Sequence, residues 1–312
     1  MKKIVLFLSI LLPLSLILSA CSNSNEQSHK KKDQLTIYTT VFPLQYFAEQ
    51  IGGKYVDVKT IYPPGADEHT FEPSQKDMMN LADSDLFFYI GLGLEGFVEK
   101  TKGTLKNENV TLVPAAEGLK LPKVSNPHDE EDGDHQHSDV NPHVWLDPIY
   151  SKEMAAVIRD GLAKKMPKNK ELFNKNYQKL AGELDELNTK YEQTITTAKH
   201  KKFIVTHAAF GYWEQRYGIE QISISGLSTT NEPTQKELEK IISIADQDGL
   251  HYILFEQNVQ SKLGEIVQKE IGARALPIHN LAILSKDNIN NKETYFSLMN
   301  KNLDTLKTAL NN

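Results

Sequence analysis

The 312-residue sequence contains a single cysteine, Cys21, so the chain cannot form an internal disulfide. It also lacks the His-Glu-x-x-His pattern, which places two zinc ligands and a base on one helix. A Gly-x-Ser-x-Gly nucleophile turn is absent as well. These two absences weigh against an extracellular hydrolase.

Positive charge is not in excess in this chain. Its 35 Lys and Arg residues face 41 Asp and Glu residues, which gives a formal net charge of −6. Proteins that bind nucleic acid concentrate Lys and Arg against the phosphates. The composition therefore argues against nucleic acid as a partner.

The sequence has a long apolar run at its N-terminus, where a basic start leads into residues 4–20 and then Cys21. This run is interrupted by Pro13 and is short for a spanning helix, which needs about 20 apolar residues. Small residues precede the cysteine, as they do at a signal cleavage site. The pattern resembles the lipobox of bacterial lipoproteins, in which the cysteine becomes the acylated first residue. An uncleaved anchor helix or a buried cysteine are the alternatives. We expect a lipid-anchored protein on the outer face of the cytoplasmic membrane.

The rest of the sequence alternates between strand-like and helical segments. Residues 35–40 (LTIYTT) have the side-chain alternation and several of the β-branched residues typical of a strand, and Pro43 then opens a helical stretch. Strand-like and helical segments continue to alternate up to residue 113 and again from 203 to 278. This order predicts βαβ units with mostly parallel sheets. Between the two stretches, residues 169–199 read as one helix of roughly 45 Å. Its heptad signal is too irregular to favour a coiled-coil dimer, so we expect a monomer.

The predicted fold is therefore α/β, with two βα lobes joined by one long rigid helix. The expected parts are a lipoprotein signal peptide (1–20), a flexible linker (21–34), an N-terminal α/β lobe (35–166) with a His- and acid-rich loop (125–140), a connecting helix (167–200) and a C-terminal α/β lobe (201–312).

Three of the ten histidines have similar settings. His69 lies in a loop after a predicted strand, His143 lies just before a helix, and His207 directly follows a strand. In open α/β sheets ligands gather beyond the carboxyl ends of the strands. A single loop histidine is more often a capping or solvated residue. Three neutral imidazoles brought together there would form a metal site suited to zinc.

The residues around these histidines form three motifs, at 68–74 (EHTFEPS), 141–148 (NPHVWLDP) and 206–212 (THAAFGY). Together they resemble the zinc- and manganese-binding proteins of bacterial ABC importers, the cluster A-I solute-binding family. The resemblance runs from about residue 35 to the C-terminus. It implies that His69, His143 and His207 are metal ligands. Manganese-selective relatives have a glutamate as the third ligand and manganese prefers oxygen, so a third histidine indicates a zinc-type member.

The fourth ligand is not defined by the resemblance. In many relatives a carboxylate follows the last strand, but Ala282 stands at that position here. His279, Glu68 and water are the candidates. Glu256 aligns with a recurrent glutamate of the family, which we interpret as support for the lobe interface.

The loop at 125–140 contains His128, His135 and His137 among acidic residues, and no apolar residue lies between His128 and Ser138. Such a segment cannot pack into a core. Short His-rich tracts bind metal weakly, and zinc-type relatives carry a similar insertion. The alternative is a solvated acidic loop.

These features together predict a carrier rather than an enzyme. The expected function is an extracytoplasmic component of an ABC importer, which captures Zn(II) as transported ligand and delivers it to a membrane permease with a cytoplasmic ATPase. A manganese-binding importer component is one alternative. An extracellular zinc hydrolase is another, because a catalytic zinc also uses three protein ligands and an open position. A surface adhesin is compatible with the lipid anchor but leaves the three histidine motifs unexplained.

Overall fold

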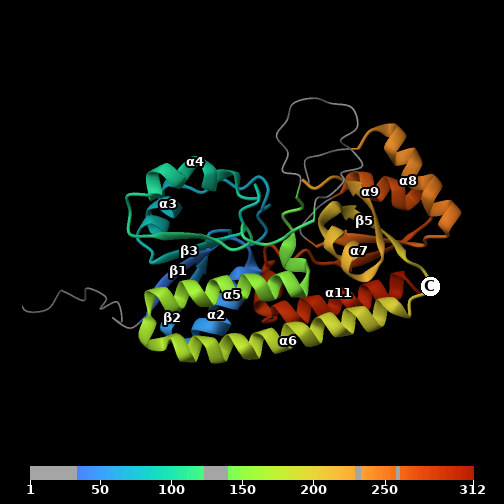
Figure 1. Cartoon of the computed structure of the whole chain (residues 1–312). Helices are drawn as coiled ribbons and strands as arrows, with labels where there is room; N and C mark the ends of the chain where they lie inside the picture. Colours follow the sequence, from blue (N-terminus) through green and yellow to red (C-terminus); the bar gives the residue numbers. More distant parts are fainter. Residues whose placement is uncertain (1–33, 123–139, 229–232, 258–260) are drawn as a thin grey trace, which may run out of the picture. The chain divides into compact units, whose positions relative to one another are not determined.

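The computed structural model describes residues 34–122, 140–228, 233–257 and 261–312 (Figure 1). Residues 1–33, which include the expected signal peptide, Cys21 and most of the linker, lie outside the described residues. So do His128, His135 and His137 of the loop at 125–140.

The N-terminal lobe is built on a four-stranded parallel sheet in the order β2-β1-β3-β4. All of β3 is buried, which explains its uninterrupted apolar sequence. Phe87 points to one face, where its ring lies 6.5 Å from Phe97 of α4, and Phe88 points to the other face, where Gly161 of α5 permits a close approach. The elements are β1 (Leu35–Thr39), α2 (Phe42–Gly52), β2 (Val56–Thr60), α3 (Gln75–Ala82), β3 (Leu86–Tyr89), α4 (Gly96–Leu105) and β4 (Thr111–Pro114).

The C-terminal lobe repeats this topology with a second four-stranded parallel sheet in the order β6-β5-β7-β8. The prediction of two βα lobes with parallel sheets is therefore confirmed. The elements are β5 (Lys202–His207), α7 (Gly211–Tyr217), β6 (Glu220–Ser225), α8 (Gln235–Asp248), β7 (Tyr252–Glu256), α9 (Lys262–Glu270) and β8 (Arg274–Ile278).

One long helix, α6 (Lys170–Thr196), runs from the first lobe to the second, and the preceding helix α5 (Pro148–Lys165) packs on the first lobe beside it (Figure 1). At 27 residues α6 is shorter than the expected 169–199, because a separate 3-10 turn occupies residues 167–169 and the helix already ends at Thr196. Asn176 on α6 donates to the Ile51 carbonyl of the first lobe at 2.9 Å. Asn188, further along α6, accepts from the Tyr217 hydroxyl of the second lobe at 3.0 Å. The long connecting helix is thus bonded to both lobes.

The chain after β8 returns to the first lobe through two helices, α10 (Lys286–Asn290) and α11 (Tyr295–Ala309). The short α10 was not predicted. Tyr295 at the start of α11 packs its ring 5.0 Å from Phe47 of α2 and donates to the Trp145 carbonyl at 2.8 Å. Thr305 on the same helix donates to the Pro277 carbonyl of β8 at 2.8 Å, so the C-terminal segment contacts both lobes.

The hydrophobic core is continuous between the lobes. A single cluster includes Phe88 of the first sheet, Leu184 of α6 and Val205 of the second sheet. Ile204, next to Val205 on β5, points to the opposite face and belongs to a smaller cluster under α8 and α9. Separating the lobes widely would expose apolar surface to water, which costs a free energy of about 25 cal/mol per Å² exposed. No helix in the described part of the chain is long and apolar enough to cross a membrane.

Candidate metal centre

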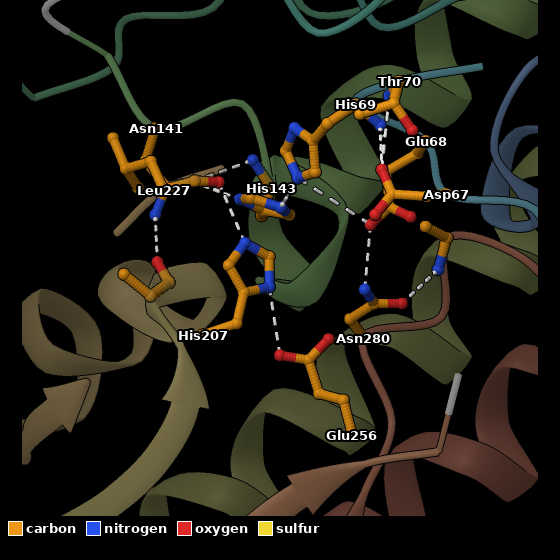
Figure 2. Close-up of polar contacts among 12 residues, drawn as sticks. Asp67, Glu68, His69, Thr70, Asn141, His143, His207, Leu227, Glu256 and Asn280 are labelled. Atoms are coloured by element: carbon orange, nitrogen blue, oxygen red, sulfur yellow. Dashed lines mark hydrogen bonds and ion pairs between the residues drawn. The ribbon is translucent and has the colours of Figure 1, made fainter. Parts of the chain in front are cut away.

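The structure brings His69, His143 and His207 together, with ligating nitrogens that all lie within 4.8 Å of one another (Figure 2). Their ring centroids are 4.8 to 5.4 Å apart. His143 and His207 are fully buried, and His69 is largely so. In the described ranges this is the one group of His, Cys, Asp or Glu side chains with such a geometry.

Each histidine is placed by local structure that its sequence specifies. His207 is the last residue of β5, at the carboxyl edge of the parallel sheet, where ligands collect in such folds. His69 lies in the loop between β2 and α3, where the Asp67 carboxylate accepts hydrogen bonds from the backbone N–H groups of His69 (2.8 Å) and Thr70 (3.2 Å). The motif around His143 ends in Asp147, whose carboxylate caps the N-terminus of α5. Hydrogen bonds to Asp67 and Asp147 thus fix the segments that carry His69 and His143, whereas the end of β5 places His207.

Asn141 sets the orientation of the His143 ring. Its Oδ1 accepts from the backbone N–H of His143 at 2.9 Å and from the ring Nδ1 at 2.7 Å. With the proton on Nδ1, Nε2 carries the lone pair, and it lies 3.3 Å from Nε2 of His69. Two nitrogens bound to one tetrahedral zinc at about 2.0–2.1 Å would also be separated by about 3.3 Å. The spacing therefore fits two imidazole ligands of a single zinc ion.

His207 is held at both ring nitrogens. Nδ1 lies 3.0 Å from Oε1 of Glu256, and Nε2 lies 2.8 Å from the carbonyl oxygen of Leu227. Both partners accept, so both nitrogens carry protons in this arrangement. Burial alone would lower the pKa of His207, but the Glu256 carboxylate and these hydrogen bonds raise the pKa above its ordinary value. Binding a metal through Nε2 therefore releases a proton and replaces the Leu227 contact.

The other two rings are neutral. Burial, together with the nearby charge of His207, lowers the pKa of His69 to about 4 and holds the pKa of His143 well below its ordinary range. A neutral imidazole is the form that binds a metal. His69 and His143 therefore already have the protonation state of a metal ligand, whereas His207 would first have to lose a proton.

A carboxylate lies beside this cluster. Glu68 is buried, and its Oε1 is 4.0 Å from Nε2 of His69. The same oxygen accepts from Nδ2 of Asn280 at 2.8 Å, a contact that joins the loop after β2 to the segment after β8 (Figure 2). Burial raises the pKa of Glu68 to about 7. Glu68 is thus the carboxylate best placed to approach a metal bound by His69.

The structure does not bring His279 into the cluster. Its Nδ1 accepts from the Leu281 backbone N–H at 3.1 Å, and its Nε2 lies 3.1 Å from Oδ1 of Asn288. Both ring nitrogens are therefore used within the C-terminal segment. Ala282, where relatives carry a carboxylate, is buried and offers only backbone groups, with its carbonyl accepting from Phe42 at 2.8 Å.

The interpretation of Glu256 as a support of the lobe interface is wrong. Glu256 ends β7, which lies next to β5 in the same sheet, so its carboxylate meets His207 within one lobe. Its second oxygen, Oε2, is buried without a hydrogen-bond partner. The role of Asn141 was not expected from the sequence either, although its place two residues before His143 was a signal.

The fold and the buried cluster together define a two-lobed metal-binding protein. A family model described as the zinc-uptake complex component A, periplasmic, matches residues 37–309, and the chain belongs to this family. The resemblance found from the three histidine motifs is thereby confirmed.

Two similar proteins illustrate the relationship. The zinc-binding lipoprotein AdcA of Streptococcus pneumoniae (strain ATCC BAA-255 / R6) is 34% identical over 314 residues, which cover 98% of this chain and 61% of AdcA. The high-affinity zinc uptake system protein ZnuA of Bacillus subtilis (strain 168) is 33% identical over 301 residues, which cover 95% of this chain and 94% of that protein. The chain therefore spans about 61% of the length of AdcA but nearly all of the Bacillus protein.

Solved structures show the same fold. The Zn(II)-bound ZnuA-like domain of Streptococcus pneumoniae AdcA is 32% identical, with a TM-score of 0.75 over 89% of this chain and 100% of that domain. The laminin-binding protein Lmb of Streptococcus agalactiae, described as bifunctional with adhesin and metal transporting activity, is 27% identical. Its TM-score is 0.78, over 88% of this chain and 99% of Lmb.

Proposed function

We propose that this protein is the zinc-capturing component of an ABC importer, and that it holds Zn(II) as cargo between its two lobes. The observation that carries the proposal is the cluster of His69, His143 and His207, whose ligating nitrogens lie within 4.8 Å of one another. His69 and His143 come from the first half of the chain, whereas His207 ends a strand of the second lobe. A metal bound by all three would favour one relative arrangement of the lobes.

Glu68 is our candidate for the fourth ligand. It is the next residue to His69, it is buried, and its carboxylate lies 4.0 Å from the His69 nitrogen. A small movement of this loop would bring an oxygen to about 2.0–2.2 Å from a zinc ion. Three imidazoles and one carboxylate would complete a tetrahedral site. Such a closed site suits tight capture rather than catalysis, which keeps a position open for water.

Zinc is favoured over manganese because manganese prefers carboxylate and carbonyl oxygens. A third nitrogen ligand at His207 supports zinc. The relatives named above are zinc-binding or zinc-uptake proteins, which supports a carrier over a hydrolase. An adhesin role, as described for Lmb, would not account for three buried histidines around one point, so we do not propose it.

The proposed partners follow from the family. A membrane permease would accept zinc from the loaded protein, and its cytoplasmic ATPase would drive the transfer. Cys21, which lies outside the described residues, would be lipidated and would hold the protein on the outer face of the cytoplasmic membrane. The loop histidines His128, His135 and His137, also outside the described residues, would act as weak accessory ligands. We propose that the protein acts as a monomer.

Two measurements test the function. Competition titration against a calibrated chelator should give one tight zinc site per mature chain, and deletion of the gene should slow growth only in zinc-starved medium. Complementation by wild type, but not by a variant with His69, His143 and His207 all replaced by alanine, would tie the growth defect to the cluster. Normal growth of the deletion strain without zinc would contradict an importer role. Turnover of peptide, ester or phosphoester substrates would indicate an enzyme instead.

A further inference from the structure

A single buried side chain, Asn141, contacts both halves of the metal centre. Its Oδ1 accepts from the backbone and from the ring of His143. Its Nδ2 donates to the carbonyl of Ala208 at 3.4 Å, across the lobe interface and one residue beyond His207. Only 1% of Asn141 is exposed, so water does not offer substitute partners to this amide.

The second lobe is built closely around Asn141. The Tyr212 hydroxyl of α7 donates to the Asn141 backbone carbonyl at 2.5 Å. Gly211 precedes it, and a Cβ at this position would lie 3.2 Å from Nδ2 of Asn141 and 3.2 Å from Nε2 of Gln221, both tighter than ordinary van der Waals contact. The absence of a side chain at Gly211 therefore leaves the room that the Asn141 amide occupies.

The chemistry of the contacts requires an amide. One end must accept from the His143 ring, and the other end must donate to a carbonyl of the opposite lobe. An aspartate provides the first contact but not the second, and an alanine provides neither. If the lobes separated at Ala208, the Asn141 side chain would lose one of its two restraints and its hold on the His143 ring would weaken.

We propose that Asn141 is a positioning residue that couples the contact between the lobes to the orientation of His143. The proposal rests on the proposed function, because it concerns the strength with which the three-histidine cluster holds zinc. It gives the site a route for release: a small separation of the lobes near Ala208 loosens one ligand without any group attacking the ion. The bond that fixes His143 in its Nδ1–H tautomer is thus also sensitive to lobe position.

The test uses variants of the mature chain that separate the two contacts. Asn141→Ala removes both, Asn141→Asp keeps the acceptor for His143, and Gly211→Ala crowds the Asn141 amide from the second lobe without changing Asn141. Asn300→Ala, which removes an Asn-to-carbonyl bond within α11, is the control. Zinc affinity is measured by competition, and the His143 tautomer is measured by long-range ¹H–¹⁵N NMR on zinc-free protein.

We expect Asn141→Ala to weaken zinc binding by roughly 10- to 100-fold, the usual effect of losing a partner of a metal-bound histidine. Its His143 should become a mixture of tautomers, whereas Asn141→Asp should retain the Nδ1–H form. Gly211→Ala should shift both readouts in the direction of Asn141→Ala, and the control should shift neither. Wild-type affinity and tautomer in Asn141→Ala would overturn the positioning role. Wild-type values in Gly211→Ala would overturn the coupling to the second lobe.

The tautomer measurement needs no metal, so it separates this inference from the proposed function. If wild type bound no zinc but Asn141→Ala still changed the tautomer, the importer role would fail while the positioning role stood. If wild type bound zinc tightly and the variants changed neither readout, only the positioning role would fail. Circular dichroism and thermal unfolding of each variant confirm that the comparison is made between folded proteins.

Discussion

Nδ1 of His207 lies 3.0 Å from the carboxylate of Glu256, and neither side chain is accessible to solvent beyond 2%. An adjacent carboxylate in a buried setting favours the protonated imidazole, so it makes the proton on Nε2 harder to remove. The same carboxylate makes the imidazole a stronger metal ligand once that proton has left. We therefore expect Glu256 to influence both the affinity of the proposed site for zinc and the pH dependence of that affinity.

Glu256→Gln should change the pH dependence of zinc binding. In wild type the raised pKa of His207 means that zinc displaces a proton at neutral pH, so the apparent affinity should rise by about tenfold per pH unit up to that pKa. The glutamine can still accept from Nδ1 but carries no charge, so the pKa of His207 should fall and the rise should end at lower pH. Zinc titrations from pH 6 to 8 measure the slope of affinity against pH for wild type and for Glu256→Gln. Any contribution of Glu68 to this slope is common to the two proteins. Equal slopes would show that Glu256 does not control the proton on His207.

Single replacements of His69, His143 or His207 by alanine should each weaken zinc binding by more than about 100-fold. The reason is that loss of even an outer hydrogen-bond partner costs about 10- to 100-fold, and a ligand bond contributes more. His251→Ala is the control, because His251 is exposed and lies outside the cluster. Competition titration measures all four variants. Zinc binding of wild-type strength in His207→Ala would mean that the site lies elsewhere.

Zinc should raise the midpoint of thermal unfolding, because a ligand that binds only the folded state stabilises it. At a free zinc concentration one hundred times the dissociation constant, the free energy of unfolding should increase by about 2.7 kcal/mol. Manganese at the same concentration should give a much smaller shift, since the proposed donors are mainly nitrogen. Differential scanning calorimetry with each metal makes the comparison. Equal shifts would remove the argument for zinc selectivity.

Cys21→Ser should leave zinc affinity unchanged and should detach the protein from the membrane. The serine cannot form the thioether through which a lipoprotein is anchored, and residue 21 is far in sequence from the three histidines. Membrane fractionation with immunodetection gives the distribution, and titration of the purified protein gives the affinity. Retention in the membrane fraction after cleavage of the signal sequence would indicate another anchor.

Deletion of residues 129–137 should leave one tight zinc site and should remove additional weak binding. This segment contains two of the loop histidines and most of the acidic side chains around them. Calorimetry measures both classes of site, and growth in zinc-limited medium tests whether the weak sites assist capture. A missing tight site in the deletion variant would mean that the loop provides a primary ligand, whereas unchanged calorimetry and growth would leave it as a solvated insertion.

The order of strands and helices could be predicted because local patterns specify them. The β3 sequence Leu-Phe-Phe-Tyr indicates a buried strand, and Ser74 and Thr234 mark helix starts with capping boxes that the structure contains. The short α10 was missed although Ser285 begins a similar capping box. The residue three positions after Ser285 is Asn288, whereas the capping-box signature has an acidic residue or glutamine there. Periodicity is too weak a signal in five residues.

The three histidines could be found from their motifs, but their supporting contacts could not. Glu68 and Asn280 are 212 residues apart in sequence, and their hydrogen bond exists only because the segment after β8 returns to the first lobe. The partner of Glu256 depends on the adjacency of β5 and β7, which strand order alone decides. Sequence patterns describe what each segment prefers, whereas these pairs depend on how distant segments pack.

The bonds of α6 to both lobes give its length a functional meaning. Asn176 and Asn188 are twelve residues apart on the helix, which corresponds to about 18 Å along its axis. Because Asn176 is bonded to the first lobe and Asn188 to the second, this stretch of α6 sets the distance between the two bonded positions. Removing one turn of α6 would shorten this distance by about 5 Å, which exceeds the 4.8 Å within which the histidine nitrogens lie. The length of α6 would thus affect the spacing of the three histidines, although α6 contributes no residue to the cluster.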